Sequence, residues 1–238
     1  MVSLTPMCPV CGSAPNADGS HVCRDVAVRK PLGFDWPKPP ITRSPEALTA
    51  GWITTFTGRR VYPLRMSADQ IDLLDLAHHL SMRVRYSGAV RNFYSVAEHS
   101  ILMARYLIEN MEVLPNRNML AKWALMHDAS EAYLPDISAP IKPILNGFKV
   151  FENLILVCIG ERFSLPVFSV ERPEGPSVKE IDLRIRIDEA AALLNQGDRR
   201  KPTDGFDYGH PLDVRIEAWL PDEAERRFLE CAELLEIK

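Results

Sequence analysis

A histidine, an aspartate and a glutamate stand close together in segment 119–143, at His127, Asp128 and Glu131. Apolar residues recur around them at helical spacing, which predicts a buried helix that Pro135 ends. Glu131 follows His127 by four residues and Asp128 by three, so it is expected on the same face. Charged groups are seldom buried unless they are paired or bound to metal. Two interpretations follow: a metal site, or a hydrogen-bonded core histidine beside solvated acids.

A second histidine, His99, falls in the first turn of another predicted helix. Ser95 and Glu98 form a capping box, so this helix should begin at about Val96. The helix dipole disfavours a positive charge at that end. A neutral imidazole therefore suits His99, and it favours metal ligation over a salt bridge.

The remaining pattern predicts an all-α fold, a helical bundle of about six helices with little strand. Further helices are expected over 69–80, 148–163, 178–195 and from Pro221 onward. Asp182 lies next to the apolar stripe of its helix, as Asp128 does. A stretch rich in Thr and aromatic residues at 52–63 predicts a short hairpin.

Ser67 is expected to cap the helix over 69–80, with Leu74 on its apolar stripe. Leu234 and Leu235 are expected on the buried side of the last helix.

The composition narrows the class of protein. The chain has 238 residues, 46% of them apolar, and a net charge of −4, which argues against a general nucleic-acid binder with a basic face. No apolar run approaches the roughly 18 residues of a membrane span. The N-terminus lacks the charged and apolar regions of a secretory signal. We expect a cytoplasmic protein whose five cysteines are thiols or metal ligands rather than disulfides.

Residues 1–45 differ from the main domain expected over 46–238. They are rich in proline and cysteine and show little periodicity. One interpretation is a zinc knuckle with four tetrahedral ligands, Cys8, Cys11, His21 and Cys23. The other is a loose tail that carries thiols, because a second CxxC, the usual partner of the first, is replaced by His-x-Cys.

The segment 82–93 is basic and aromatic, with Arg85 beside Tyr86. It could be a solvated loop. It could also hold a substrate, with a guanidinium for phosphate and a ring for a base.

The series His99, His127-Asp128 and Asp182, each on a different predicted helix, resembles the HD-domain metal-dependent phosphohydrolases. The resemblance runs from about Trp52 to the C-terminus and includes YSVAEHS and MHDASEAYLPDISAPIK. These motifs look most like the 5′-deoxynucleotidases and the related phage and bacterial deoxynucleoside triphosphate hydrolases. They look less like the alarmone hydrolases or the cyclic-dinucleotide diesterases.

The resemblance implies one divalent metal, Mn²⁺, Co²⁺, Ni²⁺, Zn²⁺ or Fe²⁺, held by His99, His127, Asp128 and Asp182. It implies that Glu131 is the catalytic acid or base. Substrate contacts are implied at four positions: phosphate at Arg85 and Lys142, ribose at Asp136, and base or sugar at Tyr86. For Asp136 the alternative is that it supports a neighbouring residue of the site instead of touching the ribose.

The function expected from the resemblance is hydrolysis of free deoxynucleotides at the 5′ α-phosphate, which releases the deoxynucleoside. Monophosphates and triphosphates, such as dATP, are both open as substrates. The alternatives are a phosphodiesterase of a signalling nucleotide, and a zinc-knuckle binding or regulatory protein on a silent HD scaffold. The resemblance also implies a homo-oligomer, a dimer or higher, in a bacterial cell or a phage-infected host cell.

Overall fold

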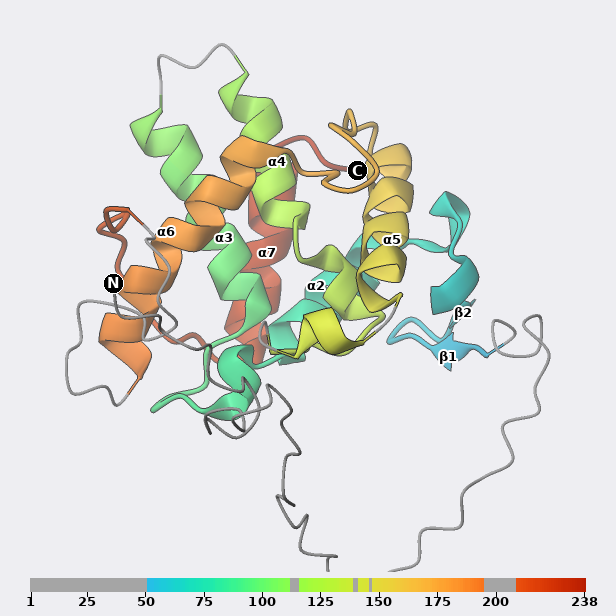
Figure 1. Ribbon diagram of the computed structural model, residues 1–238, viewed down its shortest axis with the longest axis horizontal. Helices are drawn as coiled ribbons and strands as arrows, with labels where there is room; N and C mark the ends of the chain where they lie inside the picture. The colour runs from blue at the N-terminus through green and yellow to red at the C-terminus, as the bar shows by residue number, and fades with distance from the viewer. Residues whose placement is uncertain (1–50, 112–115, 139–140, 146, 195–208) are drawn as a thin grey trace, which may run out of the picture. The chain divides into compact units, whose positions relative to one another are not determined.

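The structure, a computed structural model, describes residues 51–111, 116–138, 141–145, 147–194 and 209–238. Within these ranges it holds six α-helices and one two-stranded sheet, which confirms the mostly helical fold (Figure 1). No helix among them combines the length and hydropathy that a membrane crossing requires. The predicted extension and its Cys8, Cys11, His21 and Cys23 lie outside the described residues, so the zinc site and the domain boundary stay predictions.

The α-helices are α2 (Leu73–Met82), α3 (Val96–Asn110), α4 (Arg117–Met126), α5 (Phe148–Arg162), α6 (Pro176–Leu193) and α7 (Pro221–Leu234). Short 3-10 helices join them: η1 (Pro63–Arg65), η2 (Ala68–Gln70), η3 (Arg85–Gly88), η4 (Ala129–Ala132) and η5 (Lys142–Ile144). Strands β1 (Ile53–Thr54) and β2 (Arg60–Val61) pair antiparallel, which confirms the hairpin.

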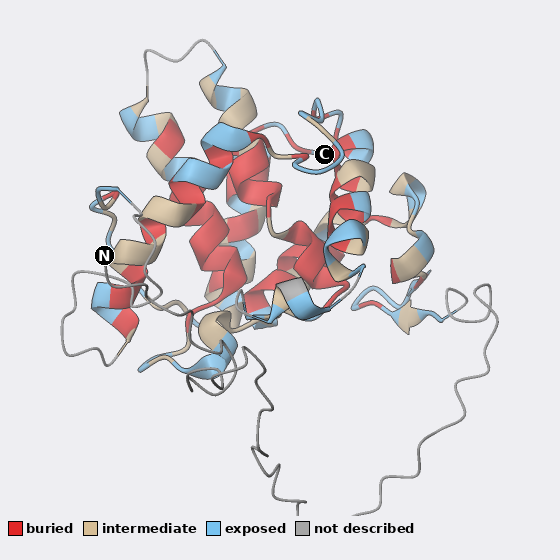
Figure 2. Ribbon diagram, in the orientation of Figure 1, coloured by how far each residue is buried: buried red, intermediate tan, exposed pale blue. Residues whose placement is uncertain are grey.

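The core lies where α3, α4 and α7 meet, with α2 packed against α7 (Figure 2). Its largest fully buried side chains include Tyr94, Met103, Leu125 and Phe228. Burial of each such side chain contributes about 1.5–3 kcal/mol, which fixes the helices relative to one another. Because α3 is enclosed, the histidine in its first turn, His99, is fully buried.

Helix α2 begins later than the sequence predicted. Ser67 makes no capping hydrogen bond, and the residues after it form η2 instead. Asp72 is the N-cap of α2, and its side chain accepts from the backbone N–H of Leu74. The prediction for Leu74 was wrong: it lies in the first turn of α2 and is 39% exposed, and the buried face of this helix runs through Leu76, Ala77 and Leu80 instead.

Helix α4 ends sooner than predicted, so His127, Asp128 and Glu131 do not all lie on one α-helix. The last helical residue is Met126, and His127 is the C-cap. The chain then tightens into η4, where the Glu131 N–H donates to the Asp128 carbonyl at 2.9 Å. A 3-10 turn eclipses side chains three residues apart, so Asp128 and Glu131 still share a face, as the spacing suggested.

Only the serine half of the predicted capping box forms. Ser95 Oγ accepts from the Glu98 N–H at 3.0 Å, so α3 begins at Val96 as expected. The buried Glu98 carboxylate points elsewhere, and accepts from three consecutive backbone N–H groups, those of Glu217, Ala218 and Trp219, at 2.7–2.9 Å. Glu98 thus ties the segment before α7 to the first turn of α3, next to His99.

Helix α7 begins at Pro221 as predicted, but one of the two leucines expected on its buried face is exposed. Leu235 is buried, whereas Leu234 is 73% exposed. The other buried positions of α7 are Ala224, Phe228, Cys231 and Ala232. The prediction for Leu234 was wrong because Leu235 follows Phe228 by seven residues, two helical turns, and so continues the buried face, whereas Leu234 lies about 100° away from it.

We expect Glu98→Gln to lower the free energy of unfolding by about 1–3 kcal/mol, because an amide nitrogen would replace one of the two oxygens that accept from the backbone. Urea denaturation of the full chain measures this. Glu109→Gln on the same helix is the control: that side chain is 58% exposed and pairs with Arg105, and its loss should cost less than about 0.5 kcal/mol. Equal effects of the two substitutions would contradict the anchoring role of Glu98.

Candidate metal centre

The four residues predicted to bind metal come together from three helices. His99 lies in the first turn of α3, His127 at the C-terminus of α4 and Asp182 in the second turn of α6. These three are buried, and one ligand atom of each lies within 4.8 Å of the others. Asp128 Oδ2 lies 3.2 Å from His127 Nε2 and 3.8 Å from His99 Nε2. The group could therefore hold a metal ion.

The outer nitrogens of both imidazoles are committed to hydrogen bonds. His99 Nδ1 lies 2.6 Å from Glu189 Oε1, and His127 Nδ1 lies 2.8 Å from the Ala124 carbonyl oxygen. Neither a carboxylate nor a carbonyl can donate, so both Nδ1 atoms must carry the proton. In the neutral rings the two Nε2 atoms are then acceptors, and they face each other at 3.2 Å.

Two buried acceptors that face each other need a donor or a cation to satisfy their lone pairs. The carboxylates of Asp128 and Asp182 also point there, with Asp182 Oδ1 3.4 Å from His99 Nε2. A proton can partly meet this need: burial lowers the pKa of His127, but the two carboxylates outweigh it and raise the pKa above its usual value. Two imidazoles and two carboxylates are donors that a borderline divalent ion accepts well.

Glu189 is central to the site, although the sequence analysis did not single it out. It is fully buried on α6. Its carboxylate accepts from His99, Tyr94, Arg85 and Tyr86. Burial alone would raise the pKa of Glu189, but Arg85, His99 and these hydrogen bonds lower it to about 2. One signal was available: Glu189 follows Asp182 by seven residues, two helical turns, on the same face.

Arg85 lies inside the site, so the alternative of a solvated loop is wrong for this residue. Its side chain is 13% exposed and joins Asp128 Oδ2 at 3.3 Å to Glu189 Oε2 at 3.1 Å. Tyr86 follows with a φ of 55°, a conformation that costs a non-glycine residue free energy. This turn brings the Tyr86 hydroxyl to 2.6 Å from Glu189 Oε2.

Glu131 has the environment of a group that can hold a proton. Its carboxyl group is buried, and Oε2 has no hydrogen-bond partner among the described residues. Burial, followed by the negative charges of Asp128 and Asp136, raises the pKa of Glu131 well above its ordinary value. Oε1 lies 3.9 Å from Lys142 Nζ. Glu131 thus lies close enough to Asp128 to feel its charge, and within the described residues its Oε2 is not used in any hydrogen bond.

Two lysines lie next to acidic side chains of the centre. Lys142, on η5, donates to the buried Glu152 at 2.9 Å and approaches Glu131. Lys179, which the sequence analysis did not single out, pairs with Asp182 Oδ2 one helical turn away. Asp136 is half-buried, and burial raises its pKa against the opposing charges of Arg85 and Lys142.

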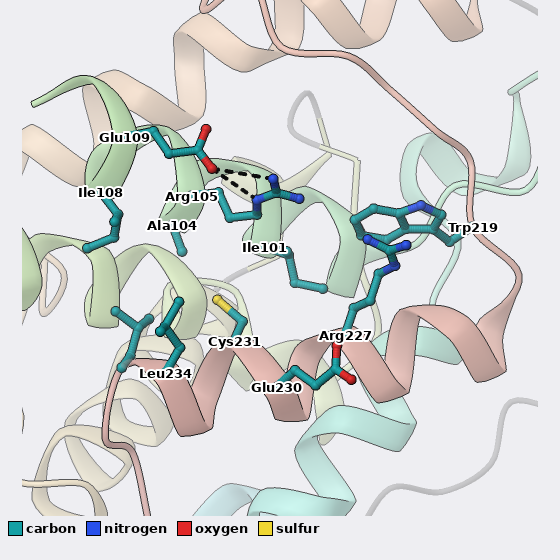
Figure 3. A pocket seen from close by; sticks show the side chains of 11 residues that line it. Ile101, Ala104, Arg105, Ile108, Glu109, Trp219, Arg227, Glu230, Cys231 and Leu234 are labelled. Carbon is teal, nitrogen blue, oxygen red and sulfur yellow. Dashed lines mark hydrogen bonds and ion pairs between the residues drawn. The ribbon is translucent and has the colours of Figure 1, made fainter.

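A separate hollow of about 200 Å³ lies between α3 and α7 (Figure 3). Apolar side chains such as Ile101 and Cys231 line it, and at its edge Arg105 pairs with Glu109. None of the residues predicted to bind metal or substrate lines this hollow. It is therefore distinct from the metal centre.

Comparison with known proteins gives relatives but no family. No family model matches the chain. The uncharacterized protein YfdR of Escherichia coli (strain K12) is 37% identical over 115 residues, which make up 48% of this chain and 60% of that protein. An uncharacterized protein of Rhodobacter capsulatus is 31% identical over 121 residues, 48% of this chain and 59% of that protein. The chain thus spans about 60% of the length of these curated relatives.

We expect Mn²⁺ to raise the thermal midpoint of the EDTA-treated protein. An ion at 100 times its dissociation constant stabilises by about 2.7 kcal/mol, or roughly 5–10 °C for a chain of this size. Asp182→Asn should lose most of this shift, since it removes a charged ligand. Glu180→Gln, on the exposed face of the same helix, should keep it. A full shift in Asp182→Asn would exclude Asp182 as a ligand.

Proposed function

We propose that this protein is a metal-dependent phosphohydrolase of the HD-domain class that acts on free deoxynucleotides. One observation carries the proposal: two facing imidazole acceptors and two carboxylates lie near Glu131, a buried residue whose Oε2 has no hydrogen-bond partner among the described residues. The first group suits a cation, and the second suits proton transfer. The order of these residues in the chain matches the resemblance noted above.

The ion would be held by His99, His127, Asp128 and Asp182, and their donor chemistry fits Mn²⁺, Co²⁺, Ni²⁺, Zn²⁺ or Fe²⁺. Such an ion supplies a Lewis acid that offsets negative charge on a phosphate oxygen. The protein keeps both imidazoles in the tautomer that presents Nε2 to the ion, through Glu189 and the Ala124 carbonyl.

Cationic side chains next to the centre support a phosphate substrate. Arg85 presents a guanidinium held at one end by Asp128 and at the other by Glu189, and its Nε has no hydrogen-bond partner among the described residues. Lys142 presents an ammonium group within 3.9 Å of Glu131. In the proposed reaction both cations attract the phosphate oxygens and orient phosphorus for attack by water.

Glu131 would take the proton of the attacking water at Oε2 and return it to the departing 5′ oxygen. Burial raises the pKa of Glu131, and a more basic carboxylate accepts a proton from water more readily. Asp136 and Tyr86, on the segments that flank the centre, would contact the sugar or base.

Chromatography of the products from a panel of dNMPs and dNTPs, with Mn²⁺, Co²⁺ and Mg²⁺ in turn, tests the proposal. Deoxynucleoside with phosphate from dNMPs would make the enzyme a 5′-nucleotidase. Deoxynucleoside with triphosphate from dNTPs would make it a triphosphohydrolase. No turnover of the whole panel by protein with metal bound would contradict the proposal.

Substitution Glu131→Gln should lower kcat by about 10²–10⁴-fold, because the amide cannot accept the proton. Metal content should stay at the wild-type level, since the residue is not a proposed ligand. The control is Glu161→Gln on the exposed face of α5, which should keep wild-type kcat. Near-normal turnover in Glu131→Gln with metal bound would show that another group handles the proton.

Lys142 and Lys149 offer a matched pair, because both ammonium groups face the Glu152 carboxylate, at 2.9 and 3.7 Å. We expect Lys142→Gln to raise KM for the nucleotide roughly tenfold or more, the loss of a charged hydrogen bond of about 1.5 kcal/mol. Lys149 is 61% exposed, and Lys149→Gln should change KM less than twofold. Steady-state kinetics on the substrate found in the panel distinguishes the two. Similar KM values for both variants would remove Lys142 from the phosphate site.

A further inference from the structure

We propose that Glu189 is a positioning residue that connects the metal centre to the phosphate-binding arginine. One carboxylate oxygen faces the metal ligand His99, and the other faces Arg85. We call these the metal half and the substrate half of the site. The proposed role of Glu189 in metal binding depends only on its hydrogen bond with His99. The substrate half rests on the function proposed above, because it requires that Arg85 bind phosphate.

The first oxygen, Oε1, holds the metal ligand. It accepts from His99 Nδ1 at 2.6 Å and from the Tyr94 hydroxyl at 2.9 Å, and all three side chains are fully buried. A carboxylate behind a ligating imidazole fixes the ring orientation and the tautomer, and increases the basicity of the other nitrogen. Glu189 thereby makes Nε2 of His99 an acceptor that points at His127 and Asp182.

The second oxygen, Oε2, binds the two residues proposed to contact the substrate. It accepts from Arg85 Nη2 at 3.1 Å and from the Tyr86 hydroxyl at 2.6 Å. Both donors belong to η3, where Tyr86 and Ser87 have positive φ angles of 55° and 50°. These hydrogen bonds offset the strain of the turn and keep the Arg85 guanidinium beside Asp128.

Only a carboxylate satisfies all four donors. Glutamine has one acceptor oxygen, and its amide nitrogen would face either His99 Nδ1–H or the Arg85 guanidinium. If the nitrogen faces His99, the imidazole must move its proton to Nε2 and lose its metal-binding lone pair. If the nitrogen faces Arg85, the guanidinium meets a donor and shifts away from Asp128. Glu189→Gln should therefore weaken one or both halves of the site.

Tyr94→Phe is the matched control, because it removes one donor to Oε1 but leaves the His99 hydrogen bond in place. Mn²⁺ affinity is measured by equilibrium dialysis of the EDTA-treated full chain, with circular dichroism to confirm folding. We expect Glu189→Gln to weaken Mn²⁺ binding about 10–100-fold, the usual effect of losing such a partner of a ligand. Tyr94→Phe should weaken it less than about threefold. Unchanged affinity in folded Glu189→Gln overturns the inference.

The substrate half is measured separately, at saturating Mn²⁺. Glu189→Gln should raise KM for the nucleotide, and Tyr94→Phe should leave KM within twofold of the wild type. Weaker Mn²⁺ binding with unchanged KM would overturn the link to Arg85. Weaker Mn²⁺ binding in a protein whose wild type hydrolyses no nucleotide would support the metal half and overturn the proposed function instead.

A measurement on the unsubstituted side chain covers the case in which Glu189→Gln does not fold. Nitrogen-15 NMR of the metal-free, histidine-labelled protein reads the tautomer of each imidazole at high pH, with a His99→Gln sample to assign the signal. The inference requires the His99 proton on Nδ1. A proton on Nε2 would overturn it.

Discussion

The structure depends on one constraint: two buried imidazoles face each other with lone pairs rather than N–H groups. His99 and His127 each give the Nδ1 proton to an oxygen that can only accept, so their Nε2 atoms, 3.2 Å apart, are both acceptors. Asp128 and Asp182 add negative charge to the same point. Burial of this much unbalanced acceptor capacity is costly unless a cation completes it. We therefore expect a proton or a metal ion to occupy this position in the folded protein.

The packing of the helices holds the two imidazoles and the acidic residues around them in position. His99 is held in the first turn of α3, where the neighbouring Glu98 fastens the chain before α7 through three backbone N–H groups. Helix α6 brings two acidic residues to the site, Asp182 beside the imidazoles and Glu189 behind His99. Each acid has a role that the other cannot take, because one faces the cation position and the other fixes the ring.

The positions of most helices were predictable from the sequence. Helical periodicity and Pro221 identified the helices, and the Ser95 cap gave the start of α3. The early end of α4 was not predictable, because apolar spacing is similar in an α-helix and a 3-10 turn over three or four residues. Glu189 was missed for a different reason. Its four donors come from η3, from Tyr94 and from α3, and only tertiary packing brings them to one carboxylate.

The most direct test of the cation centre is a crystal structure of the protein grown with Mn²⁺, with anomalous scattering used to locate the ion. We expect one strong peak between the imidazoles, about 2.0–2.3 Å from Nε2 of His99 and of His127, with a carboxylate oxygen of Asp182 also bound. Mn²⁺ found only elsewhere, or coordination through Nδ1 of His99 with Glu189 displaced, would contradict this expectation.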